Sequence, residues 1–335
     1  MNVVLVLIDS LNRHHLSPYR ESLVSTPNLN RFASKAWCFD NHFVGSLPCM
    51  PARREIFAGH EEMMWRPWGP LGPYDARLPR LLEERGYSTA IVTDHYHYWE
   101  EEANGYIQSF QGSELVRGHE KDFWKQPVPD DEPMPRWVEN IERWRPGMGR
   151  RYYANVKDFE SEEDFFPAKV MGGAAGWLEE NGRKGPFLLQ VESFDVHEPF
   201  HVPEPYASMY GDGKGGERFT LWPPYQDTEQ LSKFMASATP EELAYIRSQY
   251  YGKLTMVDRW FGGLLDKLDE LSLWEDTMVV VTTDHGHDLG ERGNFGKQYP
   301  HFDSHANIPL FIWYPVRPGN GSPRSPPPWT CSRRS

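Results

Sequence analysis

The chain has 335 residues, with 35 Lys and Arg against 48 Asp and Glu, so its formal net charge is −13. The length suits one large domain or two ordinary ones, and 39% hydrophobic residues are enough for a sizeable core. The acidic balance argues against a nucleic-acid or anionic-membrane partner, although local cations or a metal ion can still hold a small anion in a cleft. Three cysteines are too few for a disulfide framework.

The first strand is expected at 3–8, an unbroken run of Val, Leu and Ile that Asp9 ends. The run is too short for a signal peptide and has no basic residues before it. No other apolar stretch reaches the length of a membrane span. We therefore expect a soluble protein in the reducing cytoplasm.

Similar apolar runs alternate with helical patterns along the rest of the chain. Further strands are expected at 89–92, 187–191 and 278–281, and helices at 75–85, at 168–180 and from Pro240 to about Leu268. Alternating strands and helices predict an α/β fold whose mostly parallel central sheet is sandwiched by helices. Segment 112–166 is rich in charge, Pro and Trp, and we expect an irregular excursion over the sheet edge rather than a separate domain.

Asp and His residues follow each of the four predicted strands. Asp9 follows the first, and clusters at 94–97, 195–198 and 284–287 follow the others. The carboxyl ends of parallel strands share one edge of a sheet, so these clusters should converge there and bind a divalent cation. A single Asp after a strand is usually a turn former or a helix cap, and His95 and His97 also fit a packed aromatic surface. Four coincident clusters favour the metal site.

Segment 49–53 reads Cys-Met-Pro-Ala-Arg and fits the pattern C-x-P-x-R. It resembles the signature of the type I sulfatases, the formylglycine-dependent, arylsulfatase-like enzymes of the alkaline phosphatase superfamily. Further segments are similar to other motifs of that family: Thr-Pro-Asn-Leu at 26–29, Gly59, Gly-Tyr-Ser-Thr-Ala at 86–90, His-Glu-Pro at 197–199, Thr-Asp-His-Gly at 283–286, Lys297 and Ile-Pro-Leu at 308–310. The resemblance spans residues 2–314 and implies the alkaline-phosphatase-like fold.

The resemblance implies that Cys49 is oxidised to formylglycine by a partner, a formylglycine-generating or sulfatase-maturing enzyme. One hydroxyl of the hydrated aldehyde would attack the sulfur of a small-molecule sulfate ester and displace the alcohol. The second hydroxyl would then expel sulfate by restoring the aldehyde, a step that a serine could not perform. The implied activity is that of a sulfuric ester hydrolase.

The resemblance also assigns the site residues. The metal ligands would be Asp9, modified Cys49, Asp284 and His285, with calcium as the first choice and manganese or magnesium as alternatives. Three further residues would be catalytic: Arg53 orients the diol, Lys297 and His197 hold the non-bridging oxygens, and one of these two protonates the leaving alcohol.

Four positions depart from the family pattern. Ser10 follows Asp9 where many sulfatases have a second Asp, His285 replaces an Asn, and His60 replaces an Arg after Gly59. Asp94-His95-Tyr96-His97 replaces a Lys-x-His in which the lysine binds sulfate, and whether His95 or His97 takes its place stays open. The first two changes also occur in the related phosphonate monoester hydrolases and phosphodiesterases. Activity on those esters is therefore the alternative, and an inactive fragment is another.

The composition changes at 316–335, which is rich in Pro, Ser and Arg and has no acidic residue. We interpret residues 1–315 as the catalytic domain and 316–335 as a disordered or frameshifted tail. A shifted reading frame forces an Asp at codons 329–330 and permits a string similar to the sulfatase continuation. We therefore expect the smaller C-terminal subdomain of the family to be missing. Neither the alcohol of the ester nor the oligomeric state is predicted, although Tyr98, Trp99, Trp124 and Trp137 suit the stacking of a ring.

Overall fold

The computed structural model describes residues 1–315 apart from 64, 101–102 and 226, so the predicted tail lies outside the described residues. Its centre is a seven-stranded sheet in the order β2-β9-β6-β1-β5-β3-β4. The strands are β1 (Asn2–Ile8), β2 (Trp37–Cys38), β3 (Ser88–Thr93), β4 (Gly112–Leu115), β5 (Phe187–Ser193), β6 (Thr277–Thr282) and β9 (Leu310–Trp313). Strands β4, β3, β5, β1 and β6 run parallel, and β9 and β2 each pair antiparallel with their neighbour. The predicted α/β fold with a mostly parallel sheet is confirmed.

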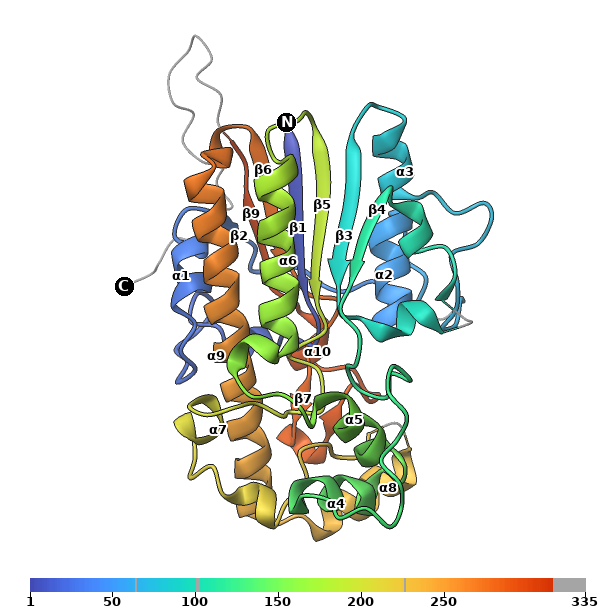
Figure 1. Ribbon diagram of the computed structural model, residues 1–335, viewed down its shortest axis with the longest axis vertical. Helices are drawn as coiled ribbons and strands as arrows, with labels where there is room; N and C mark the ends of the chain where they lie inside the picture. Colours follow the sequence, from blue (N-terminus) through green and yellow to red (C-terminus); the bar gives the residue numbers. More distant parts are fainter. Residues whose placement is uncertain (64, 101–102, 226, 316–335) are drawn as a thin grey trace.

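Helices cover both faces of the sheet (Figure 1). They are α1 (Pro27–Ala33), α2 (Cys49–Ala58), α3 (Leu78–Glu83), α4 (Arg136–Trp144), α5 (Met148–Val156), α6 (Phe166–Asn181), α7 (Tyr206–Met209), α8 (Thr228–Ser237), α9 (Pro240–Glu270) and α10 (Asp303–Ala306). The three predicted helices correspond to α3, α6 and α9. Of these, α3 is shorter than expected because it begins beside Pro79, which suits the first turn of a helix.

The core lies on the two faces of the sheet because successive strand residues point to opposite sides. Val4 and Val6 of β1 pack in the larger cluster with residues of α1, α6 and α9. On the other face, Ile91 of β3 and Leu188 of β5 pack with Met50 of α2. The sheet is therefore covered on both sides, as the continuous apolar strands predicted.

Segment 112–166 is not irregular throughout, which corrects that part of the prediction. Its first residues form β4, which pairs parallel to β3 and extends the sheet by one strand. It also contains α4 and α5, whose apolar residues pack against Trp222 in a cluster of their own. The charged and Pro-rich composition concealed these short elements, although Val138 and Ile141 of α4 recur at helical spacing and are buried.

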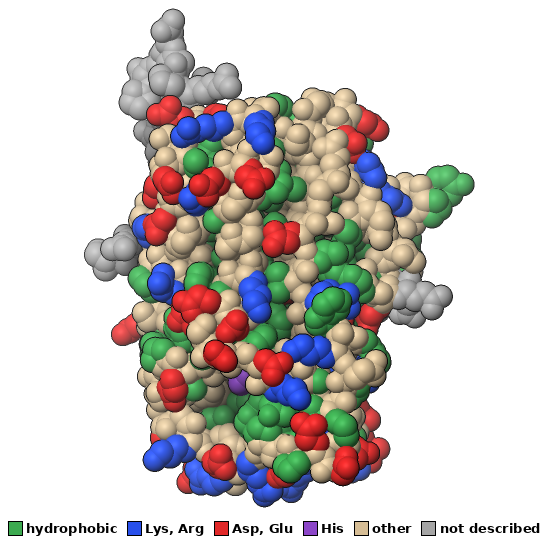
Figure 2. Space-filling model, in the orientation of Figure 1, with side chains coloured by type: hydrophobic (Ala, Val, Ile, Leu, Met, Phe, Trp, Pro, Cys, Tyr) green, Lys and Arg blue, Asp and Glu red, His purple; other side chains and the backbone are tan. Residues whose placement is uncertain are grey.

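The carboxyl ends of the parallel strands point toward a smaller layer that contains α4, α5, α8 and α10 (Figure 1). The short hairpin of β7 (Asp288–Leu289) and β8 (Phe295–Gly296) belongs to the same layer. Acidic and basic side chains are intermixed over the molecular face shown in Figure 2. Among the described residues, no helix is long and apolar enough to cross a membrane.

Candidate active site

Cys49 is the first residue of α2, and its side chain is buried at the strand edge. Its Sγ lies 3.2 Å from Nε2 of His285 and 3.2 Å from Nζ of Lys297. Helix α2 ends at Gly59, whose φ of 75° is in the left-handed region that glycine adopts readily. Helix α2 holds the thiol next to residues from two other parts of the chain, His285 and Lys297.

The four predicted metal ligands lie together. One donor atom from each of Asp9, Cys49, Asp284 and His285 falls within 4.8 Å of all the others, and all four residues are buried. Asp9 follows β1, whereas Asp284 and His285 follow β6, the strand beside it in the sheet. Parallel pairing of β1 and β6 therefore brings together residues that are 275 positions apart.

A backbone contact fixes the orientation of the His285 ring. Its Nδ1 lies 2.9 Å from the main-chain oxygen of Gly286, so this nitrogen carries the proton and donates. Nε2 then has its lone pair directed toward Cys49 and toward Oδ2 of Asp284, which is 3.2 Å away. Burial is the main cause that lowers the pKa of His285 to about 3, which keeps the imidazole neutral. A backbone acceptor that fixes the tautomer is typical of metal-binding histidines.

Arg53 lies one helical turn after Cys49 and is fully buried. Its guanidinium contacts three carboxylates: Asp9 at 2.8 Å, Asp284 at 2.6 Å and Glu192 at 2.6 Å. It also donates to the main-chain oxygen of Cys49 at 3.1 Å. The resemblance assigned Arg53 to the orientation of the diol, whereas its contacts in this structure are with the carboxylates and the backbone of residue 49.

The balance of charge around these residues suits a cation. Three buried carboxylates, those of Asp9, Asp284 and Glu192, share the single guanidinium of Arg53. Burial raises the pKa of Asp9 well above its usual range, and the adjacent Asp284 raises it further. A divalent ion among the oxygen and nitrogen donors would compensate the remaining negative charge. The residues therefore fit a divalent metal.

Lys297 and His197 face the same cavity as Cys49. Although burial opposes it, the surrounding Cys49 and Tyr225 raise the pKa of Lys297, so this side chain stays charged. Burial lowers the pKa of His197, and the charge of Lys297 lowers it further. Nδ1 of His197 lies 2.9 Å from the main-chain oxygen of Glu198, and Nε2 lies 3.2 Å from the Tyr225 hydroxyl.

We call Asp9, Cys49, Asp284 and His285 the ligand group. The clusters that follow β3 and β5 supply no member of it. Asp195 binds Lys253 at 2.5 Å and His119 at 2.6 Å, and Oδ1 of Asp94 accepts from the main-chain nitrogen of Phe194. The prediction that all four clusters form one metal site is thus wrong for these aspartates. Lys253 and the imidazole of His119 occupy the carboxylate of Asp195, and a backbone N–H occupies that of Asp94.

His95 and His97 occupy different surroundings. His97 lines the cavity, and its Nδ1 is 2.6 Å from Oε2 of Glu100. His95 is fully buried, and its Nε2 is 3.8 Å from Oδ2 of Asp9. Burial, followed by the charge of Arg53, lowers the pKa of His95, which leaves a neutral ring.

The cavity above Cys49 has a volume of about 750 Å³, which is large enough for an organic ester. Its lining comprises Pro48, Cys49, Trp68, His97, Trp99, Glu100, Lys121, Phe123, His197, Tyr225, Lys297 and Gln298. Of the four aromatic residues expected to stack a ring, only Trp99 is among them. Tyr98 is buried and donates to Glu192, Trp124 packs against Arg117, and Trp137 stacks on His201.

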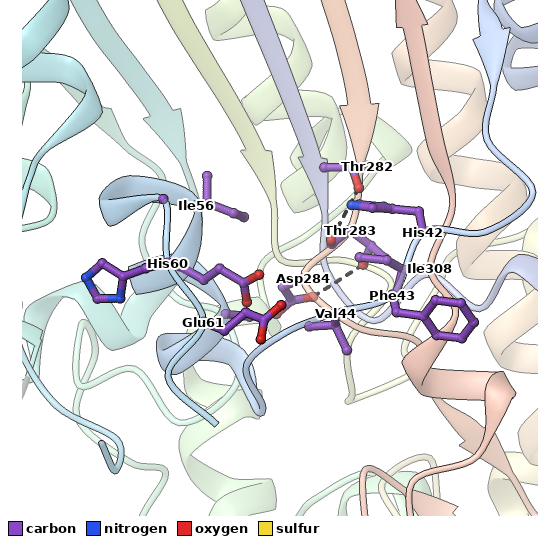
Figure 3. Close-up of a pocket in the computed structure, with 13 residues that line it drawn as sticks. His42, Phe43, Val44, Ile56, His60, Glu61, Thr282, Thr283, Asp284 and Ile308 are labelled. Carbon is purple, nitrogen blue, oxygen red and sulfur yellow. Dashed lines mark hydrogen bonds between the residues drawn. The ribbon is translucent and has the colours of Figure 1, made fainter. Parts of the chain in front are cut away.

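A second pocket, of about 380 Å³, lies between α2 and the end of β6 and is lined by Ile56 and Asp284 among others (Figure 3). Glu55, Glu61 and His42 are among its lining residues, and Thr283 donates to Oδ1 of Asp284 at 3.3 Å. On the side of this pocket, Asp284 is thus held by hydrogen bonds from the protein. Its carboxylate also belongs to the group of four candidate metal ligands.

His60, which stands where the family has an arginine, is outside the ligand group. It lies 3.7 Å from the buried Glu62, with Asp75 nearby. Arg54 and Arg66 already pair with Glu62, so their charges compensate this small acidic group.

Two residues at the site were not predicted. Glu192 is the sixth residue of β5 and pairs with Arg53, and Tyr225 contacts His197. A Glu at the end of an otherwise apolar strand is a sequence signal for a buried partner, and Glu192 could have been found in this way. Tyr225 lies in a loop with no regular pattern, so only the folded chain reveals its position.

Comparison with known proteins supports this architecture. The family model described as Sulfatase matches residues 1–323. Iduronate 2-sulfatase of Homo sapiens is 26% identical over 348 residues, which cover 95% of this chain and 60% of the relative. Choline-sulfatase of Rhizobium meliloti (strain 1021) is 23% identical, with 95% and 64% covered. The chain spans about 60% of the length of such curated relatives.

Solved structures share the fold. The phosphonate monoester hydrolase of Agrobacterium radiobacter superposes with a TM-score of 0.68 at 22% identity, over 93% of this chain and 67% of the other. A 2-O GAG sulfatase superposes with a TM-score of 0.62 at 15% identity, over 94% and 64%. Because the Sulfatase model matches nearly the whole length, the chain belongs to the sulfatase family.

Proposed function

We propose that this protein hydrolyses a sulfate ester to an alcohol and sulfate, using a divalent metal and a formylglycine made from Cys49. The observation that carries the proposal is the position of Cys49. Its Sγ lies 3.2 Å from both a neutral imidazole, His285, and a charged ammonium, Lys297, at the wall of the large cavity.

Asp9, Asp284 and His285 would hold the metal together with modified residue 49. A bound divalent ion would lower the pKa of a hydroxyl group next to it and neutralise negative charge on the ester. Oxidation of Cys49 would place oxygen where Sγ now lies, and this oxygen would be the nucleophile toward sulfur. A formylglycine-generating or sulfatase-maturing enzyme is therefore the partner that we propose.

Lys297 is the cation that faces the ester. Its ammonium lies next to residue 49, where negative charge develops on the oxygens bound to sulfur during attack. A fixed positive charge in a buried site stabilises such a transition state more than it stabilises the ground state. Arg53 is committed to three carboxylates, so Lys297 is the side chain placed for this role.

His197 and Tyr225 form the group that can pass a proton to the departing alcohol. The Tyr225 hydroxyl contacts Nε2 of His197, while Nδ1 is held by a main-chain oxygen. Both residues line the cavity where the alcohol would leave, and the Tyr225 hydroxyl is the atom of the pair that carries the proton, because Nε2 of the neutral His197 ring has only a lone pair.

The experiment is a comparison of turnover of an aryl sulfate and a phenyl phosphonate by protein co-expressed with a maturing enzyme. The proposal expects hydrolysis of the sulfate, and a Cys49→Ala variant should lose it entirely. Cys38→Ala, which removes a cysteine outside the ligand group, is the matched control and should keep it. A strong preference for the phosphonate would overturn the choice of sulfate.

Hydrolysis of phosphonate monoesters or phosphate diesters is the second candidate. The nitrogen ligand of His285 and the hydroxyl of Ser10, which bonds Oδ1 of Asp9 at 2.7 Å, favour it. Both residues depart from the usual sulfatase pattern in the way that those related hydrolases do. A nitrogen donor also makes manganese a better candidate than calcium, which prefers oxygen ligands.

A further inference from the structure

His305 is a fully buried histidine of α10 whose ring connects two segments on either side of Lys297. Its Nε2 lies 2.7 Å from Nδ1 of His301, which follows Lys297 by four residues. Its Nδ1 lies 3.5 Å from Oδ2 of Asp288 in strand β7. The ring therefore stands between the part of the chain that precedes Lys297 and the part that follows it.

Asp288 connects this ring to the residue just before Lys297. In the β7–β8 hairpin, Asp288 pairs with Gly296, the residue that precedes Lys297. The carboxylate of Asp288 also accepts a hydrogen bond from Ser304 of α10. Segment 297–300 is thus held at both ends, by the hairpin on one side and by the bond between the two histidines on the other.

Helix α10 is also fixed to the segment that carries the candidate metal ligands. The main-chain oxygen of His305 accepts from the main-chain nitrogen of Gly286 at 3.0 Å, and Gly286 follows His285 directly. A Cβ at residue 286 would collide with the main-chain oxygen of Ser304, so this close approach requires glycine. The ligand segment therefore sets the position of His305, and His305 sets the position of the segment after Lys297.

The charges of these side chains make the bond between the histidines directional. Although burial opposes it, His305 and Ser304 lower the pKa of Asp288, so this carboxylate is ionised. A carboxylate beside Nδ1 of His305 favours the tautomer with its proton on that nitrogen, which leaves the lone pair of Nε2 to accept. Nδ1 of His301 is then the donor of the 2.7 Å bond.

We propose that His305 and His301 are positioning residues for Lys297, which together hold its ammonium beside residue 49. Nζ of Lys297 contacts Sγ of Cys49 at 3.2 Å and forms no ion pair with a carboxylate of the described residues. Its place is therefore set by the backbone that carries it. The role of Lys297 in ester hydrolysis rests on the proposed function, whereas its position does not.

The test measures how fast an amine-acetylating reagent modifies Lys297 in the full chain before maturation, with mass spectrometry as the readout. His301→Leu should raise the rate at Lys297 about five- to tenfold, because loss of a buried hydrogen bond lets the segment open more often. His301→Asn, whose side-chain N–H replaces the Nδ1 donor, should keep the parent rate. His14→Leu is the matched control and should also keep it, since it removes another half-buried histidine, whose ring forms no hydrogen bond within the described part of the chain.

Lys253, which is buried on α9, is the internal reference for general unfolding. Equal rises at Lys297 and Lys253 in His301→Leu would indicate a general loss of stability and would overturn the proposal. An unchanged rate at Lys297 in His301→Leu would overturn it as well. So would a rise in His301→Asn or His14→Leu as large as that in His301→Leu.

Turnover of an aryl sulfate by the matured protein tests the role in the reaction. His301→Leu should lower kcat about five- to tenfold with a smaller change in KM, because Lys297 acts mainly on the transition state, and His301→Asn should keep the parent kcat. Unchanged kcat in His301→Leu would overturn this role. The proposed function fails separately: if neither the sulfate nor the phosphonate is turned over, while acetylation of Lys297 still rises only in His301→Leu, then hydrolysis is wrong and the positioning of Lys297 stands.

Discussion

Lys253 of α9 and Asp195 form a buried ion pair behind the loop that carries His197, with 2.5 Å between Nζ and Oδ1. The same ammonium donates to the main-chain oxygens of His197 at 2.9 Å and Pro199 at 2.6 Å. One side chain thus connects the longest helix, a strand-end carboxylate and the backbone of a predicted catalytic residue. Lys253 is a positioning residue for His197.

Replacement of Lys253 by Met should lower the free energy of unfolding by about 3–5 kcal/mol, because it leaves a buried carboxylate and two carbonyl oxygens without their partner. Urea unfolding measures this change. Lys267→Met, on the same helix, removes an ammonium whose partners Glu179 and Glu270 are exposed, so it is the control and should change stability little. Equal effects of the two variants would contradict the assigned role of Lys253.

Arg53→Met should also destabilise the protein by about 3–5 kcal/mol, since the carboxylates of Asp9, Asp284 and Glu192 would repel one another without the guanidinium. Addition of a divalent metal should recover part of the loss. Glu192→Gln removes one negative charge from the same group and should be less harmful. The measurement is thermal unfolding of the parent, Arg53→Met and Glu192→Gln, each with metal and with a chelator. A melting temperature of Arg53→Met that does not respond to metal would argue against this cluster as the metal site.

Metal removal should lower the melting temperature of the parent. A ligand that binds only the folded state at a hundred times its Kd stabilises it by about 2.7 kcal/mol. Asp284→Asn should abolish this dependence, whereas Asp212→Asn, at an exposed loop position, should retain it. Differential scanning calorimetry against metal concentration is the measurement, and equal metal responses of the two variants would place the ion elsewhere.

The buried carboxyl group of Asp258, outside the active site, should make the stability of the protein depend on pH. Its carboxylate accepts from the main-chain nitrogens of Asn28 and Leu29 at the start of α1, and burial raises its pKa from 3.8 to about 6. Between about pH 4 and 6 the folded state binds more protons here than the unfolded state, so this group's contribution to stability falls as the pH rises through that window. Asp258→Asn removes the titration.

The destabilisation caused by Asp258→Asn should therefore be larger at pH 5 than at pH 7. Unfolding titrations of parent and variant at both pH values provide the comparison, and other groups cancel in the difference. A larger loss of stability at pH 7 than at pH 5 would mean that the surroundings stabilise the ionised form of Asp258, and it would contradict this prediction.

The sequence predicted the parts of the site that lie on strong local patterns. Asp9 and Asp284 end apolar strands, and the motif at Cys49 opens a helix that stops at Gly59, so their places follow from periodicity, turn chemistry and resemblance. The metal-binding role of these residues stays a prediction, and so do the roles of His197 and Lys297.

Long-range charge pairing could not be predicted. Asp195 looked like Asp284 in sequence, yet Lys253, 58 residues later, neutralises it in the folded protein. Arg53 likewise pairs with three carboxylates at the ends of β1, β5 and β6, and no local sequence pattern indicates these contacts. The helices of segment 112–166 pack against Trp222, but α4 also has a local signal that the prediction missed, since Val138, Ile141 and Trp144 recur at helical spacing.

The central claim is that residue 49, as formylglycine, is the nucleophile of a sulfatase. The most direct measurement combines mass spectrometry of the peptide that carries residue 49 with aryl sulfate turnover, for protein made with and without a maturing enzyme. The account predicts that turnover rises in proportion to the fraction of residue 49 converted from cysteine to aldehyde. Turnover that is the same for unconverted protein, or absent from fully converted and metal-loaded protein, would contradict it.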